Sequence, residues 1–109
     1  MGKYLLIETR DPFDSGDVRK TYDLARGLAE ESHDVTVFLV QNGVLPTRKA
    51  SAAADDVAEL SASTTVLADG FSLRERGIQK GELVKGVKTA SIDDLVDLVA
   101  EDGRKVIWH

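Results

Sequence analysis

Short apolar runs alternate with segments of helical period along the chain, and this alternation constrains the fold more than any other feature. The runs 4–7 and 35–40 are continuously apolar, as strands are when helices cover both faces of a sheet. Between them, apolar residues recur at helical spacing: Val18, Tyr22, Ala25 and Ala29. Repetition of strand, helix and strand predicts βαβ units and a mostly parallel sheet.

The rest of the chain continues this order. We expect helices over 50–60, 72–76 and 92–99, and strands over 64–67 and 106–108. Residues 84–88 fit either a short strand or a loop. Ser91 followed by Asp94 has the form of a capping box, and Gly103 lies where a helix end is expected. Together these segments predict an α/β domain with about five strands.

Composition excludes several classes of function. A length of 109 residues suits a single domain over 1–109, and the net charge of −5 argues against binding nucleic acid through phosphate contacts. The apolar runs are too short for a membrane span or a signal peptide, so we expect a cytoplasmic protein. Because the chain has no cysteine, it can form no disulfide, thiolate metal site or cysteine nucleophile.

Polar residues follow the first three predicted strands, at the sheet edge where α/β proteins bind ligands. They are Glu8, Thr9, Asp11, Asn42 and Asp69. Alternatives stay open: Asn42-Gly43 also suits a tight turn that needs positive φ, and Asp11 suits a loop or helix cap. His33 and His109 have no spaced partner that suggests a ligand set. We predict no metal ion and no cofactor.

The segment 66–78, VLADGFSLRERGI, reads as a strand that breaks at Asp69-Gly70 and enters a short helix ending at Gly77. Ser72 and Glu75 have capping-box spacing, which predicts that Ser72 begins the helix. Asp69 then precedes a helix N-terminus, where free N–H groups favour an anion. Arg74 and Arg76 are candidates for orienting a ligand there.

Three short motifs in this order and spacing resemble the DsrE/DsrF-like family, and the resemblance spans nearly the whole chain. They are Asn42-Gly43-Val44, Arg76-Gly77-Ile78 and Gly86-Val87. The resemblance implies a Rossmann-like three-layer α/β/α fold, a cytoplasmic location and assembly into trimers or hexamers. It also implies that active members carry sulfur as a persulfide on a cysteine at the end of the third strand.

Counting back from Arg76-Gly77-Ile78, the resemblance places Asp69 at that cysteine position, or Ala68 if the register shifts by one. A second cysteine of some relatives falls on Ser72. Without a thiol, the chain is expected to be a non-catalytic subunit that binds a small anion or a partner, such as a cysteine-bearing paralogue. The alternative is an enzyme or metabolite-binding protein that uses Asp69 as a base or ligand acceptor, with Asn42 and Arg74 or Arg76 as orienting groups. A lone exposed carboxylate beside a helix N-terminus would be a poor base.

The segment around 78–87 offers a separate prediction of self-association. It contains apolar residues with no long amphipathic helix to cover them, so it could form an interface. The residues concerned are Leu73, Ile78, Leu83, Val84 and Val87. The alternative is that this segment folds back onto its own sheet edge.

Overall fold

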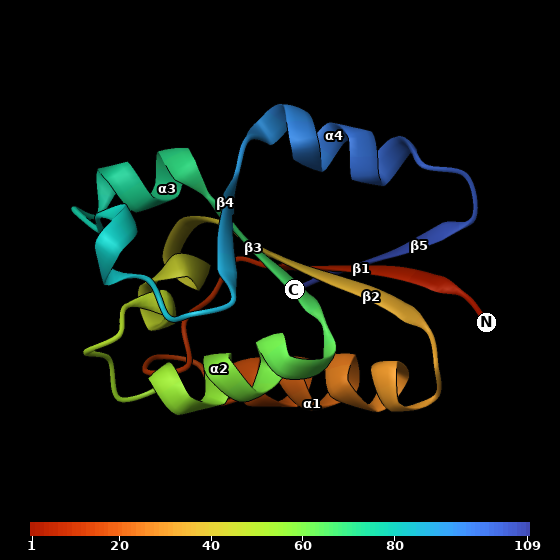
Figure 1. The fold of residues 1–109 in the computed structure, drawn as a ribbon, viewed down its shortest axis with the longest axis horizontal. Coiled ribbons are helices and arrows are strands. Elements are labelled where there is room, and N and C mark those ends of the chain that lie inside the picture. The colour runs from red at the N-terminus through yellow and green to blue at the C-terminus, as the bar shows by residue number, and fades with distance from the viewer.

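The computed structural model describes residues 1–109 and contains one five-stranded sheet in which all strands are parallel. The spatial order is β4–β3–β2–β1–β5, so the last strand lies beside the first (Figure 1). The strands are β1 (Lys3–Glu8), β2 (Asp34–Leu39), β3 (Thr65–Asp69), β4 (Val87–Ala90) and β5 (Arg104–Trp108). The predicted parallel α/β sheet is confirmed.

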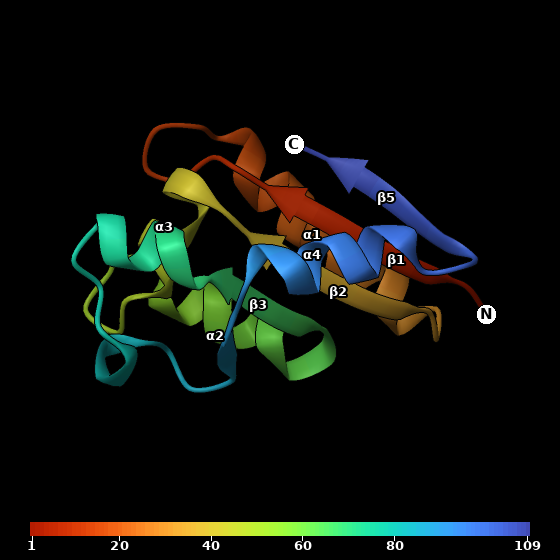
Figure 2. The ribbon, with the colours of Figure 1, turned by 90° about the horizontal axis from the view of Figure 1, so that it is seen from above.

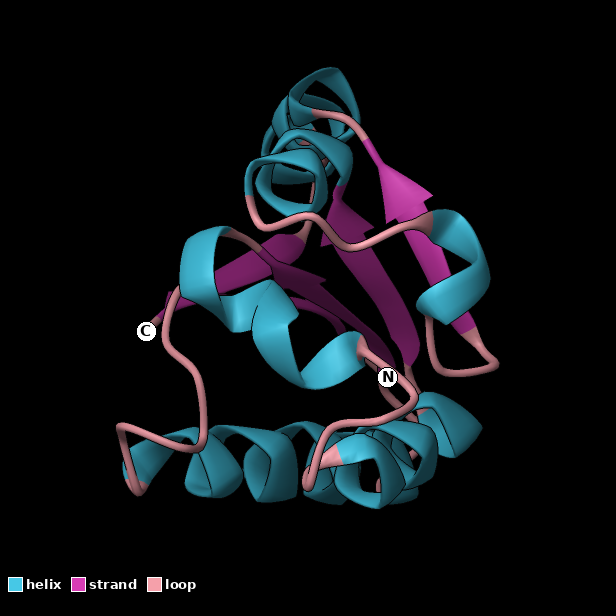
Figure 3. Cartoon of the chain, turned by 90° about the vertical axis from the view of Figure 1, so that its left-hand side faces the viewer, coloured by secondary structure: helices cyan, strands magenta, loops and turns pink.

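Helices lie on both sides of this sheet, which gives three layers (Figure 3). The longer helices α1 (Asp17–Glu30) and α2 (Ala54–Ser63) cover one face. On the opposite side are α3 (Gly70–Glu75) and α4 (Ile92–Ala100), and α4 lies over β1 and β2 (Figure 2). Two 3₁₀ segments, η1 (Gln41–Thr47) and η2 (Lys80–Glu82), complete the chain.

The two faces of the sheet are covered unequally. The larger core lies beneath α1 and α2, whereas the core beneath α4 has four fully buried residues: Leu5, Ile7, Phe38 and Val40. Leu95 and Leu98 of α4 pack against it, but no residue of α4 is itself fully buried. One short helix therefore shields this face, and apolar side chains of α4 remain at the surface.

The ends of several elements have local causes. The Ser91–Asp94 capping box is confirmed, with hydrogen bonds of 3.2 and 2.9 Å. At the end of α3, Gly77 adopts a φ of +67°, and Ile78 N–H donates to the Leu73 carbonyl at 2.9 Å. This Schellman motif ends the helix at the predicted residue.

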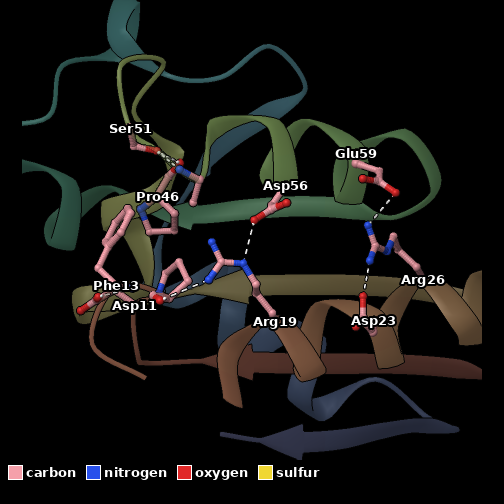
Figure 4. Close-up of polar contacts among 11 residues, drawn as sticks. Asp11, Phe13, Arg19, Asp23, Arg26, Pro46, Ser51, Asp56 and Glu59 are labelled. Atoms are coloured by element: carbon pink, nitrogen blue, oxygen red, sulfur yellow. Dashed lines mark hydrogen bonds and ion pairs between the residues drawn. The ribbon is translucent and has the colours of Figure 1, made fainter. Parts of the chain in front are cut away.

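The helix α2 begins four residues later than predicted. The Ser51 hydroxyl donates to the Pro46 carbonyl at 3.0 Å and accepts from Ala53 N–H at 3.2 Å, so the start of the alanine-rich stretch forms a turn (Figure 4). Hydroxyls that bond nearby backbone in this way compete with helix formation. In the C-terminal third, where residues 84–88 fitted either a short strand or a loop, β4 covers 87–90 and the residues before it are not in a strand.

The helices α1 and α2 are linked by arginines of α1. Arg19 contacts Asp56 at 3.0 Å, and Arg26 contacts Glu59 at 2.8 Å and also Asp23 (Figure 4). These pairs are partly exposed, and such pairs each contribute only about 0–1 kcal/mol. Burial of apolar residues beneath the two helices therefore dominates their attachment.

The predicted interface at Leu83 and Val84 is wrong. Each is 7% exposed, and Leu73 and Ile78 are also buried. Val84 N–H donates to the Thr47 carbonyl and Lys49 N–H donates to the Glu82 carbonyl, both at 2.7 Å. These bonds fold Leu83 and Val84 back onto the end of η1 and the residues after it. The alternative expected a fold-back onto the sheet edge, where Val87 does pair with Val66 of β3.

Candidate functional site

The carboxyl end of the sheet forms one wall of a cleft of about 720 Å³ that also contacts α3 and α4. Its polar lining comes from the residue after β1, from the start of η1, and from the end of β3 and α3 with its C-cap: Thr9, Gln41, Asn42, Asp69, Ser72, Glu75 and Arg76. Its apolar lining is Val40, Phe71, Ile92, Leu95 and Trp108. The predicted meeting of strand ends is thus correct for β1, β2 and β3, and β5 adds a residue.

Asp69 is the last residue of β3 and the N-cap of α3. Its Oδ2 accepts from Ser72 N–H at 3.0 Å and from the Ser72 hydroxyl at 2.6 Å. Ser72 is therefore inside the helix, and its predicted role as the cap is wrong. The cap lies three residues earlier because β3 runs directly into α3, so that Asp69 is the residue placed to accept from the Ser72 amide.

The Asp69 side chain is not exposed, contrary to expectation. The residue is only 3% exposed, and its Oδ1 has no hydrogen-bond partner in the protein. Ala68 is fully buried and packs in the larger core. Of the two residues that could occupy the family's cysteine position, only Asp69 lines the cleft.

Three other predicted residues join Asp69 in a connected network. The Ser72 hydroxyl accepts from Gln41 N–H at 2.8 Å. Arg76 donates from Nε to Asn42 Oδ1 at 3.1 Å and from Nη1 to the Ser72 carbonyl at 3.2 Å. The β2 and β3 ends are therefore held together by side chains of the site itself.

The backbone next to Asn42 differs from the predicted turn. Gln41, and not Gly43, has the positive φ, at +53°. Gly43 meets a different constraint, because a Cβ there would lie 2.3 Å from the Glu8 carbonyl oxygen. Glycine thus allows the chain after β2 to approach the end of β1.

Gly70 and Arg74 line a second hollow of about 340 Å³, which shares Asp69 and Phe71 with the cleft. The Arg74 guanidinium makes no ion pair or hydrogen bond. Asp11 lies in neither cavity. It accepts from Phe13 and Asp14 N–H groups, each at 2.9 Å, so it has the loop-stabilising role that was its alternative (Figure 4).

A buried pair of Glu8 and His109 was missed in the sequence. Glu8 is fully buried at the end of β1, and both its carboxylate oxygens contact His109 Nδ1, at 2.7 and 2.9 Å. Arg10 N–H is a further donor, at 3.1 Å. The pair forms because β5 lies beside β1 in register, with His109 N–H bonded to the Ile7 carbonyl.

Tyr22 of α1 faces the same buried region. Its hydroxyl has no hydrogen-bond partner, and the residue is 2% exposed. Burial, and next the nearby Glu8 carboxylate, raise the pKa of Tyr22 well above its ordinary value of 10.0. The phenol therefore stays neutral in the folded chain under conditions that ionise an unfolded one.

Tyr22→Phe is expected to stabilise the chain by about 1 kcal/mol, because it removes a buried hydroxyl without a partner. The raised pKa adds a pH dependence. In the wild type, ionisation of the unfolded phenol should reduce the free energy of unfolding as pH rises above 10. Urea denaturation of both chains from pH 8 to pH 11 checks this. A variant that is less stable at neutral pH would show that the hydroxyl has a partner.

The structure contains neither a cluster of possible metal ligands nor a membrane-spanning helix. No three His, Asp or Glu side chains lie close enough together to hold a metal ion. None of the helices has the length and apolar character needed to cross a membrane.

Comparisons with solved structures show that the fold is shared with other proteins. The chain is similar to MTH1491 of Methanobacterium thermoautotrophicum, a protein of unknown function, with 23% identity, a TM-score of 0.87 and all of both chains covered. It is similar to the ychN protein of E. coli, with 20% identity, the same TM-score and full coverage of both chains. BT1422 of Bacteroides thetaiotaomicron has 13% identity and a TM-score of 0.77 over 98% of this chain and 95% of its own.

These likenesses show the fold, and the family follows from the sequence. The comparison with curated proteins found no match. The model of the DsrE/DsrF-like family matches residues 2–108, nearly the whole chain. The chain therefore belongs to the DsrE/DsrF-like family, as a member without cysteine.

Proposed function

We propose that this protein is a non-catalytic, cytoplasmic subunit of a DsrE/DsrF-like assembly linked to sulfur relay. The observation that carries the proposal is Asp69, which lies at the end of β3, where the family resemblance places the sulfur-carrying cysteine. Its carboxylate is tied to Ser72 by two hydrogen bonds. A carboxylate held in this way cannot form a persulfide, and the chain contains no thiol that could replace it.

Self-association is the second part of the proposal, and the exposed apolar side chains of α4 and β5 support it. Ile92, Val96 and Val99 are each about half exposed on α4, and Val106 and Trp108 of β5 are 41% and 67% exposed. We call these five residues the α4–β5 face. Apolar surface gathered in this way is typical of protein interfaces. We propose that it joins copies of the chain, or a cysteine-bearing paralogue, in a trimer or hexamer.

The proposal predicts that the wild-type chain takes up no covalent sulfur, and Asp69→Cys serves as the positive control. After incubation with a cysteine desulfurase and labelled cysteine, the purified wild-type chain should carry no covalent sulfur. Asp69→Cys supplies a thiol beside the Ser72 amide and hydroxyl, whose donors favour a thiolate, and should become labelled. Stable label on the wild-type chain, measured by intact mass under non-reducing conditions, contradicts the proposal.

Capturing the chain from its native host tests which proteins it assembles with. Affinity purification followed by mass spectrometry should recover copies of this chain or a cysteine-containing relative. Recovery of neither, under conditions that keep the chain folded, contradicts the subunit proposal.

A second candidate function is small-molecule binding at the cleft. The unpartnered Asp69 Oδ1 favours it, because a buried acceptor without a donor raises the free energy of the empty site. A metabolite that co-purifies with the wild type and is lost from Asp69→Asn would support this function.

A further inference from the structure

We propose that the cleft beside Asp69 binds a small organic ammonium with an apolar body. This inference rests on the second candidate function and names its ligand class. It is derived from the unpartnered carboxylate oxygen, the charges around it and the aromatic walls.

The Asp69 carboxylate has one satisfied and one unsatisfied oxygen. Oδ2 accepts two hydrogen bonds from Ser72, whereas Oδ1 accepts none, and the residue is only 3% exposed. Leaving a buried acceptor unpaired raises the free energy of the empty site, and more so when the acceptor is charged. A ligand that brings an N–H donor to Oδ1 recovers this free energy.

The two nearby arginines do not supply that donor. Arg76 is bonded to Asn42 and to the Ser72 carbonyl. Arg74 lies beside Gly70, with Nη1 3.5 Å from the position that a Cβ on Gly70 would take, yet it makes no bond to Asp69. Oδ1 therefore has no donor within the chain, and because it is buried, a ligand reaches it when a neighbouring side chain moves aside.

The charge around Asp69 favours a cation over an anion. The cleft contains two carboxylates, Asp69 and Glu75, against one guanidinium, Arg76. The second hollow shares Asp69 and adds Asp94 and Arg74, so the two hollows together hold three carboxylates against two guanidiniums. With a formal net charge of −5 for the whole chain, the field around both hollows attracts cations.

The apolar lining of the cleft indicates the chemical character of the body that carries the ammonium group. Trp108 and Phe71 are 67% and 59% exposed, and Leu95 and Val40 add aliphatic surface. Aromatic rings bind ammonium groups through cation–π attraction and bury apolar groups. An ammonium joined to an aromatic or aliphatic body matches both features.

The test uses the wild-type chain, three matched probes and the fluorescence of Trp108, which is the only tryptophan and lines the cleft. The probes are benzylammonium, neutral benzyl alcohol and anionic phenylacetate. We expect benzylammonium to bind more tightly than either of the others by about tenfold or more, since it alone brings a charged N–H donor to the carboxylate.

Asp69→Asn is the informative variant because asparagine caps helices as well as aspartate does. It should weaken benzylammonium binding by about tenfold or more. Asp55→Asn, which removes the same charge from an exposed position on α2, should leave binding unchanged. Nuclear magnetic resonance shifts of the Ser72 and Phe71 amides on titration of the wild type locate the site even if the variant folds poorly.

Each other outcome overturns the inference. Equal or tighter binding of phenylacetate would reject the ammonium class while keeping ligand binding at the cleft. Equal loss of binding in both variants would assign the effect to overall charge. Failure of all three probes to bind at millimolar concentration would reject the ammonium class. Ligand binding at the cleft is tested independently by the metabolite that co-purifies with the wild type. The subunit proposal is tested by the mass of the oligomer.

Discussion

Leu83→Asp is expected to unfold the chain, whereas Val96→Asp should leave it folded and weaken its self-association. Leu83 is 7% exposed and packs in the larger core, so the variant loses apolar burial and buries a carboxylate without a partner. These effects together cost about 3–5 kcal/mol or more, a large part of the 5–15 kcal/mol typical of a folded domain. Val96 is 58% exposed on α4, so a charge there stays in water in the monomer.

Urea denaturation followed by far-UV circular dichroism measures the stability of both variants, and sedimentation velocity measures their association. The two substitutions introduce the same side chain, so they differ only in position. A Leu83→Asp chain that is native by circular dichroism but dissociated would restore the interface predicted from the sequence. A Val96→Asp chain that sediments like the wild type would exclude Val96 from the interface.

His109→Ala is expected to lower the free energy of unfolding by about 2–4 kcal/mol. Glu8 is fully buried, and the substitution leaves Arg10 N–H, at 3.1 Å, as its one remaining donor. Removing a hydrogen-bond partner from a buried group costs about 1–3 kcal/mol, and more when the group is charged. Water replaces part of the lost contact because the His109 side chain is 26% exposed.

A double-mutant cycle separates the loss of the pair from the loss of the imidazole's packing. Glu8→Gln replaces the carboxylate with a neutral amide of the same size, which is easier to bury alone. In the Glu8→Gln background, His109→Ala should therefore cost about 1–2 kcal/mol less than in the wild type. Equal costs in the two backgrounds, measured by urea denaturation, would show that the contacts between Glu8 and His109 contribute no net stability.

The strands could be predicted because each is marked by apolar residues that are adjacent in the sequence. Continuous apolar runs such as 4–7 and 35–40 require burial on both faces, and helical segments between them require parallel connections. The convergence of Thr9, Asn42 and Asp69 followed, because the carboxyl ends of parallel strands meet at one edge. The same reasoning placed Asp11 at this edge, but its carboxylate bonds its own loop.

The remaining features depend on contacts between distant parts of the chain. The Glu8–His109 pair needs β5 beside β1, a strand order that neither local sequence encodes. Burial of Leu83 depends on backbone bonds to Thr47 and Lys49. From the sequence, Gly43 also fits a turn. The structure shows why glycine is required, because a side chain there would collide with the Glu8 carbonyl.

The start of α3 at Asp69 was predicted wrongly for a different reason. Both Asp69 and Ser72 are good N-caps, and Ser72 had the additional support of Glu75 three residues later. In the structure the strand runs directly into the helix without a loop, so the last strand residue is the cap. Ser72 then bonds the carboxylate and the β2 loop.

Native mass spectrometry of the wild-type chain at micromolar concentration shows whether the chain is a subunit of a larger assembly. A non-catalytic subunit that assembles through the α4–β5 face should appear as three or six copies of the 11.8 kDa chain, or as a mixed assembly when a cysteine-bearing paralogue is added. A chain that remains a monomer, alone and in the presence of the paralogue, would contradict the account.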